Sequence, residues 1–282
     1  MTNILVTGAT GGIGRQAAIM LAEMGYRVFG AGRDLAKLQT LEEEHQDLSA
    51  IRIDISDEHS VRDAMSSILE QTDGHGVDIL INNAGFAQVG PIELVTEEEW
   101  LGQYQTNVFG LVRMSRAVLP KMRERKVGRI VNVSSVVGRV ALPYFGPYNS
   151  TKHAVEAISD ALRQELRNFG IKVTIVEPGA VKTGFAAVEQ IGFDRHGDEN
   201  SPYHEDIRLM RAFHDDLHAA GANVDTVART VVKAALARRP RTRYVTPWLK
   251  NRINLVLAEW LPTSITDGVI RNMTKLDRAK RY

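Results

Sequence analysis

Short apolar runs alternate with amphipathic stretches over the first two thirds of this 282-residue chain, and this pattern constrains the fold more than any other feature. The runs are almost wholly nonpolar, which is typical of strands buried on both faces of a sheet. The expected strands are residues 3–8, 26–32, 50–56, 77–85, 128–135 and 171–179, and the expected helices are residues 14–25, 35–45, 60–71, about 96–122 and 148–169. This order predicts an α/β protein with a doubly wound parallel sheet.

The regular alternation stops about two thirds of the way along the chain. Residues 186–222 are polar, rich in His and Asp and poorly periodic, which favours an insertion that covers the sheet. A helix over 224–238 and a last strand over 242–247 are expected next. We predict a single domain over residues 1–282 that carries a small C-terminal substrate lobe, with an extension over 240–282.

Composition and charge exclude several classes of function. A chain without cysteine has no disulfide, thiolate zinc site or cysteine nucleophile. No apolar run approaches the ~20 residues of a membrane span, and no signal peptide precedes the first strand, so we expect a cytoplasmic protein. Residues 233–282 carry a net charge of +9 and the rest of the chain −8. Such a basic end suits an acidic subunit, an anionic lipid surface or an anionic ligand, or is simply solvated.

The first predicted strand leads into a glycine-rich loop, TGATGGIGR (7–15), just ahead of a helix. Backbone N–H groups that are free of side chains at a helix N-terminus bind phosphate, so this context predicts a dinucleotide site. The loop fits two glycine spacings at once, because either Gly11 or Gly12 can join Gly8 and Gly14. The two spacings belong to different kinds of nucleotide-binding enzyme, and the loop alone does not choose between them.

The end of the second predicted strand bears on which nucleotide binds. An NAD site places an acidic residue there for the ribose 2′-hydroxyl. Here Arg33 follows the strand, and its guanidinium suits a 2′-phosphate. Arg15 is a second candidate cation, whereas Asp34 is expected to cap the next helix. The sequence therefore favours NADP, unless both arginines are ordinary surface charges.

Tyr148 and Lys152 stand four residues apart on a predicted helix, which places them on one face, one turn apart. This spacing is common and gains meaning only from the motifs around it. They are TGATGGIG, NNAG (82–85), Asn107 in QTNVFG, VNVSS ending at Ser135, YNSTK and PGAVKT (178–183).

Through these motifs the chain resembles the short-chain dehydrogenase/reductase family, in its compact single-domain branch, over residues 3–184. From Ser135 through VALPYFGPYNSTKHAVEAISDALRQEL it is similar to hydroxysteroid and retinol dehydrogenases. The resemblance implies a Rossmann fold and selects Gly8, Gly12 and Gly14 as the functional glycines.

The resemblance implies a catalytic set of Asn107, Ser135, Tyr148 and Lys152. Tyr148 would be the general acid in reduction and the base in oxidation, with its pKa lowered by the charge of Lys152. Ser135 would hydrogen-bond the substrate oxygen, while Ser134 would point to the other face of the strand. Asn107 would hold a water that links Lys152 to solvent, or is an ordinary buried polar residue.

The resemblance also assigns residues to an NADP cofactor, with Asp54 and Ile55 facing the adenine. The expected cofactor-binding residues are Gly8, Thr10, Gly12, Ile13, Gly14, Arg15, Arg33, Asp54, Ile55, Asn83, Ala84, Gly85, Tyr148, Lys152, Pro178, Gly179, Val181 and Thr183.

The expected substrate walls are mostly apolar, which favours a hydrophobic alcohol or carbonyl compound. They are Ser135, Val136, Leu142, Tyr144, Phe145, Tyr148 and Phe185, with Phe193 and Met210 as further candidates, although each aromatic is equally typical of an ordinary core.

Residues 248–262 carry an apolar helical stripe, and the basic run 238–243 precedes it. Two interpretations compete. The stripe covers the pocket or a subunit interface, as amphipathic helices usually do. Alternatively, residues 238–262 lie on an anionic membrane and deliver a lipophilic substrate.

The function predicted from the sequence is an NADP-dependent oxidoreductase for a hydrophobic, steroid-, retinoid- or lipid-like alcohol/carbonyl pair. An epimerase or dehydratase of the sugar-nucleotide branch and a non-catalytic NADP-sensing protein are the alternatives. The resemblance suggests a homodimer or homotetramer built from residues 96–122 and 148–169. We expect no metal and no nucleic acid partner.

Overall fold

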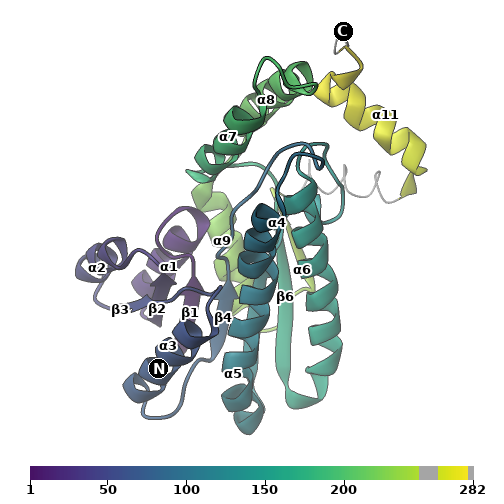
Figure 1. The fold of residues 1–282 in the computed structure, drawn as a ribbon. Helices are drawn as coiled ribbons and strands as arrows, with labels where there is room; N and C mark the ends of the chain where they lie inside the picture. The colour runs from purple at the N-terminus through teal and green to yellow at the C-terminus, as the bar shows by residue number, and fades with distance from the viewer. Residues whose placement is uncertain (248–259, 279–282) are drawn as a thin grey trace.

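The computed structural model describes residues 1–247 and 260–278, and a parallel sheet forms its centre (Figure 1). In this part of the chain the sheet has seven strands in the order β3-β2-β1-β4-β5-β6-β9, and every neighbouring pair is parallel. The strands are β1 (Asn3–Thr7), β2 (Arg27–Gly32), β3 (Leu48–Arg52), β4 (Ile79–Asn82), β5 (Gly128–Val133), β6 (Ile171–Pro178) and β9 (Arg243–Thr246). The predicted doubly wound α/β fold is confirmed.

Helices cover both faces of the sheet, and a second group of helices lies beyond one end of it (Figure 1). The helices of the two layers are α1 (Gly12–Glu23), α2 (Leu35–Glu44), α3 (Glu58–Gln71), α4 (Glu97–Tyr104), α5 (Leu111–Arg125), α6 (Gly146–Glu165) and α9 (Val224–Leu236). The group beyond the sheet comprises α7 (Phe185–His196), α8 (His204–Ala219) and α11 (Thr263–Thr274). Two short strands, β7 (Val181–Lys182) and β8 (Ala222–Asn223), pair beside it.

Strand alternation divides the core into two layers. Ile4 and Val6 of β1 pack with α1 and α9, whereas Leu5 between them packs with α3 and α5. This is the period of two that a pleated strand imposes, with both faces buried.

Several element boundaries differ from those predicted. The third strand ends at Arg52, and the expected helix over 96–122 is interrupted by a π-helical turn, Gln105–Gly110. Arg113 holds this turn through hydrogen bonds to the carbonyl and side-chain oxygens of Gln105 at 3.3 and 2.7 Å. Such π-helical turns occur mostly as single turns inside α-helices, and the sequence pattern did not reveal this one.

The segment 186–222, poorly periodic in sequence, contains most of α7 and the whole of α8. The buried face of α7 carries Glu189 and His196 beside Phe193, and that of α8 carries His214 beside Ile207 and Met210. Because polar residues occupy buried positions, hydropathy concealed the helical period.

The C-terminal stripe predicted over 248–262 lies outside the described residues up to position 259. In the parts of the chain that the structure describes, every helix is too short or too polar to cross a bilayer.

A buried polar ladder ties the two central strands to two helices on one face of the sheet. The Asn82 side chain donates to Asn132 Oδ1 (2.9 Å) and to Ser115 Oγ of α5 (3.3 Å). Asn132 in turn donates to Ser159 Oγ of α6 (2.8 Å). Since buried amides need partners, these bonds hold β4 and β5 in register with each other and fix the positions of α5 and α6 against them.

Replacing Asn132, which has no exposed surface, is expected to destabilise the fold. Asn132→Ala removes two buried hydrogen bonds, one to Asn82 and one to Ser159, and we expect the free energy of unfolding to fall by about 2–4 kcal/mol. Urea denaturation measures it, with Ser66→Ala on the exposed side of α3 as the control. A loss no larger than that of the control would contradict the structural role of the ladder.

Candidate active site

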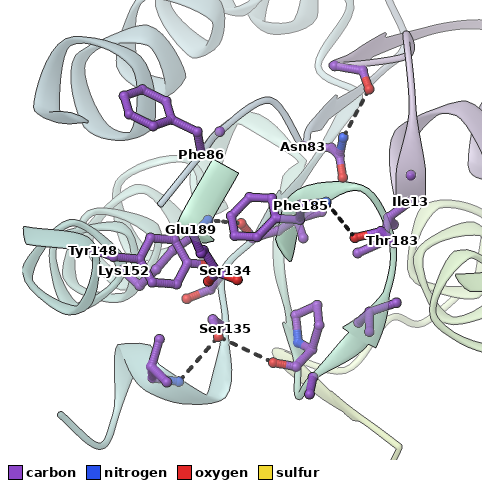
Figure 2. Close-up of a pocket in the computed structure, with 18 of the residues that line it drawn as sticks. Ile13, Asn83, Phe86, Ser134, Ser135, Tyr148, Lys152, Thr183, Phe185 and Glu189 are labelled. Atoms are coloured by element: carbon purple, nitrogen blue, oxygen red, sulfur yellow. Dashed lines mark hydrogen bonds between the residues drawn. The ribbon is translucent and has the colours of Figure 1, made fainter. Parts of the chain in front are cut away.

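One continuous cavity of about 860 Å³ runs along the carboxyl ends of the strands (Figure 2). It begins at the loop between β1 and α1 and ends among side chains of α7, α8 and α11. Sixteen of the predicted cofactor residues line it: Gly8, Thr10, Gly12, Ile13, Arg33, Asp54, Ile55, Asn83, Ala84, Gly85, Tyr148, Lys152, Pro178, Gly179, Val181 and Thr183. The predicted cofactor and catalytic motifs therefore border a single space.

The glycine loop provides an open helix N-terminus. Gly11 caps α1 without a side-chain hydrogen bond, and the first turn of α1 carries no acidic residue. Gly8 and Gly12 have φ values of +70° and +54°, which favour glycine. Uncapped N–H groups here can bind an anion, so the loop fits a dinucleotide pyrophosphate.

Gly14 has a packing role, and it is not among the residues that line the cavity. A Cβ at this position would lie 2.4 Å from the Gly8 carbonyl oxygen and 2.3 Å from Asn83 Nδ2. A Cβ at Gly11, by contrast, would meet no heavy atom within 4 Å. The third glycine of the motif is thus needed for close approach of the helix to the loop.

Two cations border the end of the cavity opposite to α7, α8 and α11, beside the carboxyl ends of β2 and β3. Arg33 is one of them, and Lys37, which sequence analysis missed, is the other. The Asp34 side chain caps α2 as predicted, accepting from the Lys37 backbone, and its carboxylate lies 3.1 Å from Lys37 Nζ.

Arg15 does not accompany Arg33, which corrects the sequence-based assignment. Its guanidinium lies 3.3 Å from the Glu44 carboxylate and borders a separate, smaller pocket. Arg15 lies nearly one helical turn along α1 from Gly12, and Gly12 lines both the cavity and the smaller pocket that Arg15 borders.

Asp54 lies near Arg33 at the same end of the cavity. Burial favours a raised pKa for its carboxyl, but hydrogen bonds from the backbone and hydroxyl of Ser56, together with the charges of Arg33 and Arg113, lower that pKa below its ordinary value. Asp54 therefore remains a charged acceptor.

Lys152 is buried beneath the middle of the cavity. Its Nζ donates to the Val133 carbonyl oxygen at 2.9 Å and lies 5.7 Å from the centre of the Tyr148 ring. Burial lowers the pKa of Lys152 to about 8, against the opposing charge of Glu156. The lysine therefore titrates near neutrality.

The electrostatics of Tyr148 differ from the expectation. Burial raises the pKa of its phenol, the Glu189 carboxylate raises it further, and a hydrogen bond with Ser135 lowers it only in part. The lysine charge does not outweigh these effects, so Tyr148 is protonated at neutral pH. The Phe185 ring lies 5.8 Å from the tyrosine ring and shields it.

Both serines that follow β5 line the cavity, whereas Ser134 was expected to point away. The strand ends at Val133, so its alternation does not continue through this pair. Ser135 Oγ accepts from the Val137 backbone at 3.3 Å and donates to the Pro178 carbonyl oxygen at 3.4 Å (Figure 2). The buried Ser134 Oγ has no hydrogen-bond partner among the described residues.

Asn107 lies in the π-helical turn and does not line the cavity. Its amide joins two neighbouring segments, accepting from Phe86 N at 3.1 Å and donating to Phe86 O at 2.9 Å and Thr151 Oγ1 at 3.2 Å. These contacts tie the chain after β4 to the residue that precedes Lys152.

The turn after β4 is fixed against β1. Thr7 Oγ1 accepts from the backbone N–H groups of Asn83 and Ala84 at 3.0 and 3.1 Å, and the Asn83 side chain donates to the Thr7 carbonyl oxygen at 3.1 Å. These bonds hold the glycine loop and the NNAG turn together.

The remaining part of the cavity has mostly apolar walls. Six of the seven predicted substrate residues line it: Ser135, Val136, Leu142, Phe145, Tyr148 and Phe185. Tyr144 does not, because its hydroxyl donates to Asp206, and Phe193 and Met210 belong to the buried core. Sequence analysis missed the walls from α8 and the C-terminal segment, which include Phe213, Leu217, Leu261, Val269, Ile270 and Met273.

Glu189, His214 and His218 also line the cavity and were missed. One signal was available in the sequence. His214 and His218 are one helical turn apart, whereas Arg33 precedes the cap of α2 and shares no helix face with Lys37.

Comparison with known proteins places these features in a family. A model of the family described as short chain dehydrogenase matches residues 2–191. The chain is 34% identical over 272 residues to the 3-ketodihydrosphingosine reductase of Bacteroides thetaiotaomicron, covering 95% of this chain and 96% of that protein.

Two further relatives carry different substrate names. The chain is 34% identical to the NADPH-dependent 3-dehydrocapnine reductase of Ornithobacterium rhinotracheale, with 87% of this chain and 88% of the relative covered. It is also 34% identical to the 17-beta-hydroxysteroid dehydrogenase type 6 of Rattus norvegicus, with 95% and 87% covered.

A solved structure supports the same grouping. The crystal structure of a short-chain dehydrogenase from Streptomyces avermitilis matches with a TM-score of 0.76 and 32% identity, covering 95% of this chain and 97% of that one.

Two substitutions in the glycine loop distinguish Gly14, which is needed for packing, from Gly11, which lines the cavity in open space. Gly14→Ala forces Gly8 and Asn83 apart, and we expect the free energy of unfolding to fall by about 1–3 kcal/mol. Gly11→Ala, at an extended φ of −173° in open space, is expected to leave stability within about 0.5 kcal/mol. Denaturant unfolding of both variants checks this, and equal losses would refute the packing role of Gly14.

Proposed function

The chain belongs to the short-chain dehydrogenase family, and we propose that it is an NADP-dependent oxidoreductase that interconverts a hydrophobic, lipid-like alcohol and its carbonyl compound. The observation behind this proposal is the continuity of the cavity. A phosphate-binding loop, the Ser135–Tyr148–Lys152 group and an apolar compartment open into one space.

The protein's own part in the reaction is to hold the substrate oxygen and to move a proton to or from it. NADPH, when bound, supplies the hydride that carbonyl reduction requires. Ser135 donates a hydrogen bond to the substrate oxygen, and Tyr148 transfers its phenolic proton to that oxygen as negative charge develops. Burial keeps the Tyr148 phenol protonated, which suits a general acid in the reductive direction.

Lys152 places a positive charge below the reacting centre. Its Nζ lies close to the Tyr148 ring and is anchored on Val133 at the end of β5. This charge stabilises the phenolate that remains after proton transfer, and Asn107 positions the adjoining turn of α6.

The preference for NADP rests on charge at the adenosine end of the cavity. Arg33 and Lys37 line that end, and β2 finishes in small residues without the acid that would accept a ribose 2′-hydroxyl. A guanidinium and an ammonium group suit a 2′-phosphate. The relative whose name includes NADPH dependence supports this preference.

The preference for a lipid-like substrate rests on the apolar walls. Leu142, Phe185 and the side chains from α8 and α11 surround the compartment beyond Tyr148. Relatives are named for a sphingosine ketone and for hydroxysteroids, which supports a hydrophobic carbonyl. The comparisons give no support to the epimerase or the sensor.

Assembly is a further part of the proposal. Leu101 of α4 and Phe109 of the π-helical turn expose 54% and 46% of their surfaces, on the helical segment expected to join subunits. We propose a homodimer or homotetramer through this face. A peripheral membrane contact through 238–262 remains the competing role for the C-terminal segment.

Turnover with a panel of ketones tests the proposed activity and its cofactor together. We expect oxidation of NADPH in the presence of sphingoid, steroid or retinoid carbonyls, with kcat/KM for NADPH at least about tenfold above that for NADH. Arg33→Ala and Lys37→Ala should each weaken the binding of NADPH by about 1–2 kcal/mol. The binding of NADH should stay nearly unchanged, because only NADPH carries the 2′-phosphate.

Lys121→Ala, on the exposed surface of α5, is the matched control for loss of a positive charge. Equal losses with both cofactors would contradict the 2′-phosphate assignment. No turnover of any carbonyl with either cofactor would contradict the proposed activity.

The pH dependence of carbonyl reduction follows from the buried lysine. Lys152 is charged below about pH 8 and neutral above it, while the raised pKa keeps Tyr148 protonated. We therefore expect kcat/KM to be level near pH 6–7 and to fall above about pH 8. Lys152→Arg should move the decline to higher pH, and a wild-type profile that rises steadily to about pH 10 would contradict this assignment.

A further inference from the structure

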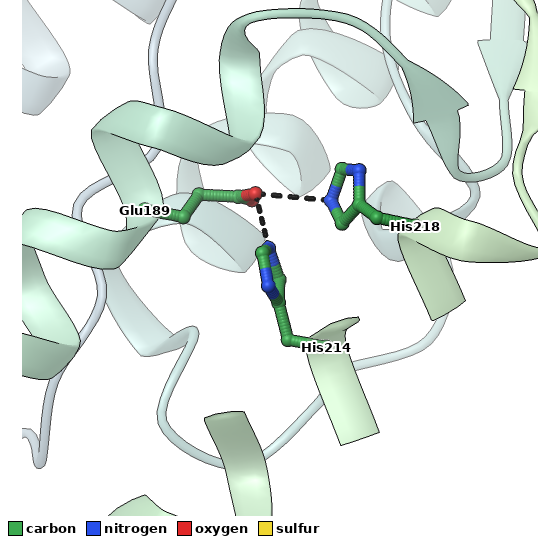
Figure 3. Close-up of side chains that lie close together, drawn as sticks. All are labelled: Glu189, His214 and His218. Atoms are coloured by element: carbon green, nitrogen blue, oxygen red, sulfur yellow. Dashed lines mark hydrogen bonds and ion pairs between the residues drawn. The ribbon is translucent and has the colours of Figure 1, made fainter. Parts of the chain in front are cut away.

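Three side chains from α7 and α8 converge on the wall of the cavity (Figure 3). Glu189 Oε2 lies 2.6 Å from His214 Nε2 and 3.1 Å from His218 Nε2. The two histidines stand one turn apart on α8, with ring centroids 4.3 Å apart. Both rings thus direct the same type of nitrogen at one carboxylate oxygen.

The cluster is enclosed. The side chains of Glu189, His214 and His218 expose only 6%, 3% and 19% of their surfaces. Phe193 and Phe145 pack beside the His214 ring at 5.5 and 6.3 Å. A polar group of this kind in an apolar shell is costly unless its charges and donors are satisfied.

The donor set matches one class of ligand. Two imidazole nitrogens and a carboxylate oxygen lie within 4.8 Å of one another. This is the donor set of a tetrahedral zinc site in which the protein supplies three ligands and the fourth position is open to water or substrate. The i, i+4 spacing of the two histidines places both on one helix face, as such a site requires.

We propose that Glu189, His214 and His218 form a binding site for a divalent transition-metal ion, for which zinc is the best match. Sequence analysis expected no metal, because it considered cysteine ligands and did not bring these helices together. The proposal concerns binding and does not depend on the oxidoreductase reaction.

The present distances are those of hydrogen bonds, and binding requires a small rearrangement. Ligand atoms around a tetrahedral ion with bonds of ~2.1 Å lie ~3.4 Å apart. Small side-chain rotations would move Glu189 Oε2 away from His214 Nε2, its closer partner, by under about 1 Å. The ion would then take the place of the two protons that the carboxylate shares with the histidines.

The surroundings of His214 support its role as a ligand. Its second ring nitrogen, Nδ1, lies 3.4 Å from Asp215 Oδ1, and Gln190 donates to that same carboxylate oxygen at 2.8 Å. A carboxylate behind a histidine fixes the ring and strengthens it as a metal ligand. The cluster therefore has an outer partner as well as inner donors.

A simple buried ion pair does not account for all three residues. The Glu189 carboxylate and the His214 ring lie 2.6 Å apart and satisfy each other as a buried pair. His214 alone is enough to form that pair. His218 adds a second donor to the same oxygen, and its buried Nδ1 has no partner among the described residues.

The open position of the bound ion would face the cavity. All three residues line it, and the Glu189 charge reaches Tyr148. A bound dication would place a Lewis acid on the substrate side of the cavity, where it can hold water or a polar group of the ligand.

Metal titration of the untagged full chain tests the site directly. After treatment with a chelator, Zn²⁺ is added in competition with a chromophoric chelator, and Co²⁺ is added separately. We expect one Zn²⁺ per chain, the visible absorption of four- or five-coordinate Co²⁺, and a melting temperature that rises with Zn²⁺ concentration.

Two variants address the ligands, and a third serves as the control. His218→Gln and Glu189→Gln should each weaken Zn²⁺ binding by about 100-fold or more, since loss even of an outer partner costs about 10–100-fold. His204→Gln removes another histidine of α8, which contacts the Gly197 carbonyl oxygen outside the cluster, and should bind as the wild type does.

Absence of stoichiometric binding, or binding that both ligand variants retain, would overturn the proposal. Because the titration is made without cofactor or substrate, such a result leaves the proposed oxidoreductase activity untouched. Loss of activity in an NADPH assay would likewise leave the metal site standing.

Discussion

Every hydrogen-bonded pair in the central sheet of the described chain is parallel, so the carboxyl ends of its strands meet at one edge. That edge brings the glycine loop after β1 against the Asn83 turn after β4, and sets Ser135 beside Pro178. The ladder from Asn82 to Asn132 keeps the two middle strands and their helices aligned behind these groups. The site depends on this common direction, because its residues are far apart in sequence.

Burial sets the chemistry of the middle of the site. Lys152 and Tyr148 are shielded by neighbouring helices and by Phe185, so burial lowers the pKa of the amine and raises that of the phenol. A protonated tyrosine close to a lysine that titrates near neutrality suits donation of a proton to a substrate oxygen. The helices beyond the sheet therefore tune the proposed catalytic pair as well as lining the compartment proposed for the substrate.

The fold could be predicted from local patterns in the sequence, whereas the residues at the middle of the site were assigned through the family resemblance. Apolar runs fix the strands, and the spacing of Tyr148 and Lys152 fixes their shared helix face. Arg15 was assigned to the cofactor and Lys37 was missed, because the packing of helices against the cavity, which no local pattern specifies, decides which surface cation borders it.

The walls contributed by α7, α8 and α11 were beyond sequence reasoning for a different reason. Their buried faces include Glu189, His196 and His214, so polar residues stand at positions where an amphipathic helix usually has apolar ones. The convergence of Glu189 with two histidines depends on how α7 packs on α8, and no local motif encodes that packing. The spacing of His214 and His218 was a sign that the sequence offered in this region, whereas the burial of these polar residues is visible only in the structure.

A crystal structure of the chain with NADP⁺ tests the central claim most directly. The account predicts the pyrophosphate at the N-terminus of α1, the 2′-phosphate between Arg33 and Lys37, and the nicotinamide facing Ser135 and Tyr148. A cofactor bound in this cavity with its 2′-phosphate away from both cations, or with its nicotinamide remote from Tyr148, would contradict the account.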